Sequence, residues 1–117
     1  MNSWVTVRTL TSETAEVAPS TGPFVALGAD APRVEIRLHT ASLANAPTSV
    51  TLAVWRTSEG VIDKIGTFTI LSGDIAHPIP QIFELGDGNV YVTVESFAGG
   101  ASPNLTAVVQ ARAVFRG

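Results

Sequence analysis

The sequence predicts one all-β domain over residues 1–117, folded as an antiparallel β-sandwich of about eight to nine strands. Apolar and polar residues alternate with a period of two along several runs, and turn-forming residues interrupt these runs roughly every 8–15 residues. The composition also favours strands: 14 residues are Val and 13 are Thr, against one Lys, one Met and two Gln. This rhythm is typical of a jelly roll or a related Greek-key sandwich.

Three segments show the alternation most clearly: Arg33–His39, Ser49–Thr57 and Asn89–Phe97. In each segment three aliphatic residues are spaced to share one face, so we expect that face in the core and the other face outward. The residues expected inward are Val34, Ile36, Leu38, Val50, Leu52, Val54, Val90, Val92 and Val94. The opposite faces carry Arg33, Glu35, Arg37, His39, Thr51, Ala53, Trp55, Tyr91, Thr93 and Glu95.

Six further strands are expected at Trp4–Leu10, Ala15–Pro19, Phe24–Leu27, Lys64–Leu71, Ile79–Leu85 and Leu105–Phe115. The last of them is apolar on both faces, which is typical of a central strand or of a subunit contact. One face holds Val109, Ala111, Ala113 and Phe115, and the other holds Val108, Gln110, Arg112 and Val114.

Turn residues separate these strands. Ser58–Gly60 predicts a short hairpin, and further turns are expected at Pro19–Pro23, Asn45–Thr48, Gly86–Asn89 and Ala98–Pro103. Residues 40–46 fit either one helical turn or a loop.

Composition and charge exclude several function classes. A formal net charge of −3 disfavours a nucleic-acid partner, because such proteins usually carry a basic excess. Without cysteine there is no thiol nucleophile, zinc–thiolate site or disulfide. No apolar run approaches the roughly 18 residues of a membrane helix, and the N-terminal residues lack a leader pattern, so we expect no membrane partner. The low charged fraction, 15%, fits either an ordinary β domain or a surface partly covered by other subunits.

Residue types that carry chemistry are few, and none forms a recognisable motif. His39 falls on the polar face of its strand and His77 in an extended proline-flanked segment, with nothing in the sequence to bring them together. Glu35 and Glu95 are the carboxylates in mid-strand, and we expect each to pair with arginine. Asp87–Asn89 is better explained by a β-turn than by a calcium loop. We therefore expect no catalytic residue, no metal and no cofactor.

Aromatic side chains are the remaining candidates. Trp4, Trp55 and Tyr91 fall by parity opposite the main apolar face of their strands. They suit a sugar-stacking platform or a protein interface, or else a second packed layer. For Trp55 a packed position is favoured, whereas interface and core are evenly balanced for Trp4. Together with the outer face of the last strand, the interface candidates are Trp4, Trp55, Tyr91, Val108, Arg112 and Val114.

The chain resembles the small β-sandwich virion proteins of tailed bacteriophages, especially the capsid decoration (cement) proteins. The likeness rests on a short cysteine-free chain rich in Thr, Val and Ala, and on the strands Val34–Leu38, Val50–Arg56 and Val90–Phe97. It covers the whole chain in character, without a signature motif. The resemblance implies a non-enzymatic homo-oligomer, often a trimer, that binds the major capsid protein and lies on the capsid exterior.

Two other classes stay open from the sequence. A carbohydrate-binding module or receptor-binding tip would use Trp4, Trp55 or Tyr91. A small β-sandwich hydrolase or isomerase would need a histidine and two carboxylates in one cleft, which the spacing does not indicate.

Overall fold

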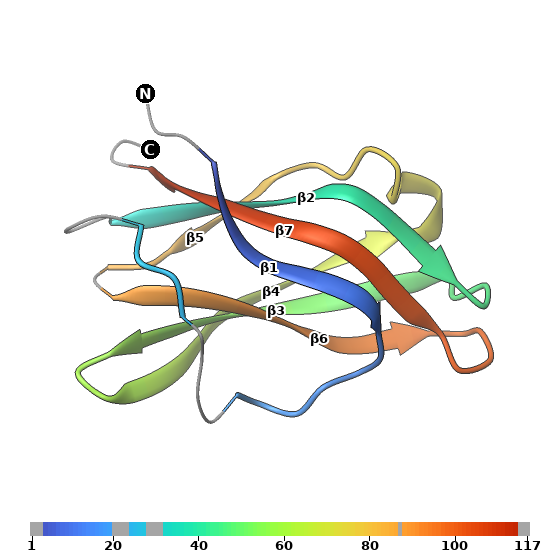
Figure 1. Ribbon diagram of the computed structural model, residues 1–117, viewed down its shortest axis with the longest axis horizontal. Coiled ribbons are helices and arrows are strands. Elements are labelled where there is room, and N and C mark those ends of the chain that lie inside the picture. The colour runs from blue at the N-terminus through green and yellow to red at the C-terminus, as the bar shows by residue number, and fades with distance from the viewer. Residues whose placement is uncertain (1–3, 20–23, 28–31, 87, 115–117) are drawn as a thin grey trace.

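The computed structural model of the chain describes residues 4–19, 24–27, 32–86 and 88–114. Seven strands in that part form two antiparallel sheets that face each other (Figure 1). One sheet has the order β1-β7-β2-β5 and the other the order β4-β3-β6. Their bounds are β1 (Val5–Glu13), β2 (Arg33–Ala44), β3 (Ser49–Ser58), β4 (Val61–Leu71), β5 (Gln81–Glu84), β6 (Asn89–Ala98) and β7 (Asn104–Val114). The expected antiparallel sandwich is therefore confirmed.

The expected count of eight to nine strands is wrong, because two expected strands do not form in the described residues. Ala15–Pro19 has no strand, and Phe24–Leu27 contributes only an isolated bridge between Val25 and Val90. Glu16 supplies the physical reason: its carboxylate takes a backbone N–H of β6 that a neighbouring strand would otherwise use. A side chain cannot propagate a ladder, so the segment follows β6 without becoming a strand.

Strand β2 is longer than the sequence indicates, because it continues past His39 to Ala44. The extension contains a bulge between His39 and Ser42, where Thr40 has a φ of 51°. A bulge inserts an extra residue and bends the strand without ending it. Residues 40–44 are therefore part of a strand, and neither alternative expected for residues 40–46, a helical turn or a loop, describes them. The helix found in the described residues is the 3₁₀ turn η1 (Ser72–Asp74).

The expected hairpin between β3 and β4 is confirmed, with Ser58 paired to Val61. Its two central residues, Glu59 and Gly60, have φ values of 52° and 80°. Positive φ at both positions is the signature of a type I′ turn, whose twist matches that of the flanking strands. Of the other expected turns, most of Pro19–Pro23 and Asp87 lie outside the described residues.

The core between the sheets is built from the residues that the alternation predicts. All nine aliphatic residues expected inward on β2, β3 and β6 are buried, and Val109, Ala111 and Ala113 of β7 join them. Phe115, expected on the same face, lies outside the described residues. Ala53 and Thr93 are also buried although their parity places them outward, because small side chains on adjacent central positions are covered by larger neighbours.

The two long sides of the sandwich are closed differently. At β4 and β5, the rings of Phe68 and Phe83 pack with centroids 5.8 Å apart. Gly66 makes room for them, since a Cβ there would lie 2.5 Å from Phe83 Cδ1. At β1 and β6, polar side chains replace a strand, as described below.

No helix in the described residues is long and apolar enough to cross a membrane.

Candidate functional site

The six interface candidates divide between the two outer faces of the sandwich. We call the outer surface of β1-β7-β2-β5 the four-stranded face and that of β4-β3-β6 the three-stranded face. The four-stranded face holds Trp4, Val108, Arg112 and Val114, and the three-stranded face holds Trp55 and Tyr91. The candidates are therefore not one site but two, on opposite surfaces.

Trp4 is the centre of the first group and lies just before β1. The guanidinium carbon of Arg37 is 4.1 Å from its ring centroid, and that of Arg112 is 4.5 Å away. Both distances are within the range of cation–π attraction. Two arginines from β2 and β7 thus hold the indole against the sheet, and no hydrogen bond ties it to a described residue.

The two arginines are themselves anchored across the strands. Arg112 Nε donates to Glu35 Oε1 at 2.6 Å, and Arg37 Nε donates to Gln110 Oε1 at 2.8 Å. The expected pairing of Glu35 with an arginine is confirmed. These bonds restrict the orientation of both guanidinium groups.

Apolar side chains flank this polar centre on the same face. Val108 and Val114 of β7 are half-buried, so the outer face of the last strand is partly covered rather than enclosed. Ile82 of β5, which pairs with Glu35, is 55% exposed. The four-stranded face therefore combines Trp and Arg, the types enriched in the energetic centres of protein interfaces, with partly exposed aliphatic residues around them.

Trp55 on the three-stranded face has a different environment. Its Nε1 donates to Thr93 Oγ1 at 2.8 Å, and Thr93 is only 4% exposed. Lys64 Nζ lies 5.5 Å from the ring centroid and also pairs with Glu95 at 2.6 Å. Glu95 thus pairs with lysine, not with the expected arginine. Trp55 is a packed part of its sheet, which is the interpretation that the sequence favours.

Tyr91 continues the same row, because it is the direct partner of Trp55 across β3 and β6. Its ring lies 5.4 Å from that of Phe24, and the Arg8 guanidinium carbon is 5.1 Å from its centroid. Phe24, Tyr91 and Trp55 therefore form a row of aromatic rings across the three-stranded face.

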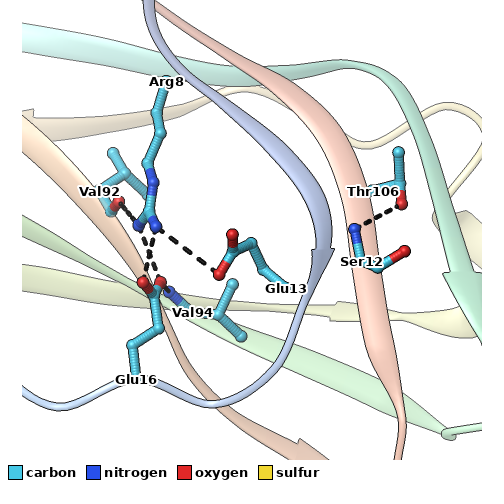
Figure 2. A network of polar contacts seen from close by, with 7 residues as sticks. All are labelled: Arg8, Ser12, Glu13, Glu16, Val92, Val94 and Thr106. Atoms are coloured by element: carbon cyan, nitrogen blue, oxygen red, sulfur yellow. Dashed lines mark hydrogen bonds and ion pairs between the residues drawn. The ribbon is translucent and has the colours of Figure 1, made fainter.

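Arg8 also closes the open edge of β6, together with Glu16 (Figure 2). The two side chains form a bidentate ion pair, with Nη1–Oε1 and Nη2–Oε2 distances of 2.8 and 2.6 Å. Arg8 Nη1 further donates to the Val92 carbonyl at 3.0 Å. Glu16 accepts from Val94 N at 2.9 Å through its carboxylate and returns its own backbone N–H to the Val94 carbonyl at 2.8 Å. We call this set of contacts the Arg8–Glu16 clasp.

The clasp makes hydrogen bonds to the β6 backbone of the kind that a paired strand makes. In an antiparallel pair, two residues exchange N–H···O bonds in both directions, as Val25 and Val90 do at 2.8 and 2.9 Å. Glu16 makes the same exchange with Val94, but uses its side chain as one acceptor. Unpaired strand edges invite association with other chains. The clasp occupies that edge, so assembly through β6 is disfavoured.

A bulge in β1 brings the clasp into position. The register shifts between Leu10 and Glu13, and Ser12 has a φ of 49°. The Ser12 N–H donates to Thr106 Oγ1 of β7 at 3.0 Å, so it is not left without a partner (Figure 2). The bend turns the chain after β1 from the four-stranded sheet toward β6.

The clasp shifts the pKa of both its charged groups. Burial alone would raise the pKa of Glu16, but the hydrogen bonds from Arg8 and Val94 and the Arg8 charge outweigh it and lower that pKa. Burial likewise opposes the charged form of Arg8, but the hydrogen bond and charge of Glu16 raise its pKa. Both groups stay ionised across the physiological range.

The two histidines are closer than the sequence suggests. His39 and His77 both line one pocket of about 470 Å³ between β2 and the segment before β5, although the sequence offers no reason to place them together. The long β2 and the proline-rich return toward β5 create this proximity. No group of three or more His, Cys, Asp or Glu in the described residues is arranged to hold a metal ion.

No family model, no curated protein and no solved structure matches this chain. The sequence and the geometry of its surfaces are therefore the basis for a functional proposal.

Proposed function

We propose that the protein is a non-enzymatic structural subunit that acts by adhesion, specifically a bacteriophage capsid decoration protein. The observation that carries the proposal is the four-stranded face, where the Trp4 ring contacts Arg37 and Arg112 and is flanked by aliphatic side chains. Tryptophan and arginine dominate the energy of protein interfaces when a rim excludes water around them.

The difference between the β6 edge and the four-stranded face supports the same proposal. The β6 edge is capped by the Arg8–Glu16 clasp, which discourages pairing there. The four-stranded face has no such cover over Ile82 and presents a pre-formed cluster. A subunit that assembles through one surface and avoids association through another fits this division.

The strand order supports a jelly-roll assignment for the fold. When the bridge segment at Val25 is counted as a reduced strand beside β6, the second sheet reads Val25 segment-β6-β3-β4, facing β1-β7-β2-β5. This is the order of an eight-stranded jelly roll whose second strand has shrunk to one bridge. Jelly rolls are common among viral shell proteins, although a fold alone does not determine function.

In this proposal the partners are further copies of the chain and the major capsid protein. A trimer is favoured, and the subunit is made in the host cytoplasm and ends on the exterior of the virion. Many modest contacts repeated by symmetry then stiffen the shell. The proposal includes no cofactor, no metal and no nucleic-acid partner.

Two experiments test this function. Neighbouring genes that encode a capsid, portal or terminase protein would support the class, and a metabolic operon would count against it. The purified protein, mixed with empty shells of the corresponding phage, is expected to co-sediment with them at a fixed stoichiometry. A protein that remains in the supernatant at saturating concentration would overturn the proposal.

The row formed by Phe24, Tyr91 and Trp55 favours a second candidate, a carbohydrate-binding module or receptor-binding tip. Aromatic rings side by side on a sheet can stack on sugar rings. A specific hit on a glycan array, lost in Tyr91→Ala, would support this candidate. An array without a hit would leave shell adhesion as the better explanation.

A further inference from the structure

We propose that the pocket shared by His39 and His77 binds a small organic oxyanion, such as a phosphate or sulfate monoester or a carboxylate. The pocket lies between residues 37–40 of β2 and the segment 76–80. It is separate from the Trp4 cluster, although Arg37 borders both.

The charge of the lining residues indicates an anion. Arg37, His39 and His77 all line the pocket, and no carboxylate does so among the described residues. Asp74 lines an adjoining pocket of about 300 Å³, and the linings of the two pockets share only His77 and Pro78. An oxyanion would therefore meet donors and positive charge without a competing carboxylate.

The donors are available for a ligand. Arg37 uses Nε to bond Gln110, and its two terminal nitrogens make no hydrogen bond to a described residue. Neither imidazole bonds to a described side chain or backbone group. A neutral imidazole carries one N–H donor and a guanidinium carries several, so these three side chains offer several donors to the pocket that they line.

The rest of the lining indicates an organic body attached to the anion. Ala76, Pro78 and Pro80 supply apolar surface, and a volume of about 470 Å³ exceeds that of a bare phosphate. Small-molecule pockets typically combine such apolar walls with a few polar groups. The prolines also limit the freedom of the segment that carries His77, which favours a pre-formed site.

The bulge in β2 explains how the site is built. His39 precedes the register shift and Thr40 lies within it, with a φ of 51° and its hydroxyl donating to the His39 carbonyl at 2.6 Å. The bulge thereby directs this part of β2 toward the return segment, beyond the four residues where β5 pairs with β2.

The test is an NMR titration of the protein at one fixed pH. Inorganic phosphate, acetate and phenyl phosphate serve as probes, and the signals of residues 37–40 and 76–80 are followed. We expect saturable shifts confined to these residues, with a dissociation constant of about 1 mM for phenyl phosphate, typical of a few charge-assisted hydrogen bonds. Inorganic phosphate is expected to bind at least about threefold more weakly, because it leaves the apolar wall empty.

Matched variants sharpen the test. His39→Gln and His77→Gln are each expected to weaken phenyl phosphate about fivefold or more, because each removes an imidazole donor. Lys64→Gln removes one positive charge from the opposite face and is expected to leave the affinity unchanged. Both histidines are exposed, so the variants should fold, and their amide spectra verify this.

Non-saturable shifts, or equal weakening by Lys64→Gln, would show a general charge effect and overturn the proposal. Binding of phenyl phosphate that survives both histidine variants would overturn it as well. The outcome is independent of shell adhesion, since the titration requires no assembly partner.

Discussion

Trp4 and Trp55 are the two tryptophans of the chain, and both fall on outward positions next to cations. Their environments nevertheless differ. Trp55 is tied into its sheet by a hydrogen bond to buried Thr93, whereas Trp4, just before β1, contacts Arg37 and Arg112 and has no hydrogen bond to a described residue. Position on a strand therefore does not show whether an outward tryptophan is hydrogen-bonded into its sheet. The distinguishing feature is whether the polar atom of the ring is already used within the sheet.

The largest effect on folding is expected at Trp55. Trp55→Ala should lower the free energy of unfolding by about 3 kcal/mol, because it removes a half-buried ring and leaves the Thr93 hydroxyl without its donor. Chemical denaturation measures this value.

A double-mutant cycle separates the two causes. Trp55→Phe keeps most of the apolar surface, and its cost should shrink when Thr93→Val is also present, because the stranded hydroxyl is then gone. Strict additivity of the two changes would show that the hydrogen bond contributes nothing.

Trp4→Ala is expected to act on assembly rather than on folding. The loss of an interface anchor should weaken self-association by about 2 kcal/mol, roughly thirtyfold, while unfolding changes by less than about 1 kcal/mol. Arg33→Gln is a suitable control on the same sheet, because Arg33 forms an exposed pair with Glu84 away from the tryptophan. An equal effect of the control would remove the special role of Trp4.

Glu16→Gln tests the clasp on the other side of the molecule. It should cost about 1–2 kcal/mol of stability, because a half-buried Arg8 loses its bidentate partner while the amide oxygen can still accept from Val94. Urea denaturation measures the loss. The capped edge of β6 is also weakened, so the variant should aggregate more readily than wild type on heating. A variant as stable and soluble as wild type would show that the clasp is dispensable.

The pH dependence of the clasp is the smallest expected effect. Because the pKa of Glu16 is lowered in the folded chain, its contribution is complete above the ordinary glutamate pKa of about 4.3 and is lost as the pH falls through the lower folded value. Stability measured across this acidic window should fall more steeply for wild type than for Glu16→Gln. Parallel curves would contradict the assignment.

Much of the fold follows from local pattern. The alternation in β2, β3 and β6 predicts all nine inward residues, and the Glu59–Gly60 hairpin follows from turn chemistry. The absence of the expected strand at Ala15–Pro19 could not be predicted, because the Glu16 side chain replaces backbone pairing at Val94. Sequence pattern reports local preference, but not a tertiary contact between Arg8 and a carbonyl of β6.

The residue types of the candidate site could be predicted from the sequence, but their arrangement in space could not. Trp4 and Arg112 are proposed from parity and composition, yet the contact of Trp4 with two arginines depends on the pairing of β2 with β7. The sequence does not predict the pocket shared by His39 and His77 for a similar reason. The alternation of apolar and polar residues does not indicate that β2 continues through its bulge.

Sedimentation velocity over a concentration series tests the central claim, that the Trp4 cluster is an assembly surface, most directly. The wild-type protein is expected to sediment as a trimer, three times the 12.2 kDa chain, and Trp55→Phe should retain that mass. Trp4→Ala should shift to the single-chain mass over the same range while keeping its β-sheet circular dichroism. A monomeric wild type, or a Trp4→Ala variant that remains as fully assembled as wild type, would contradict the account.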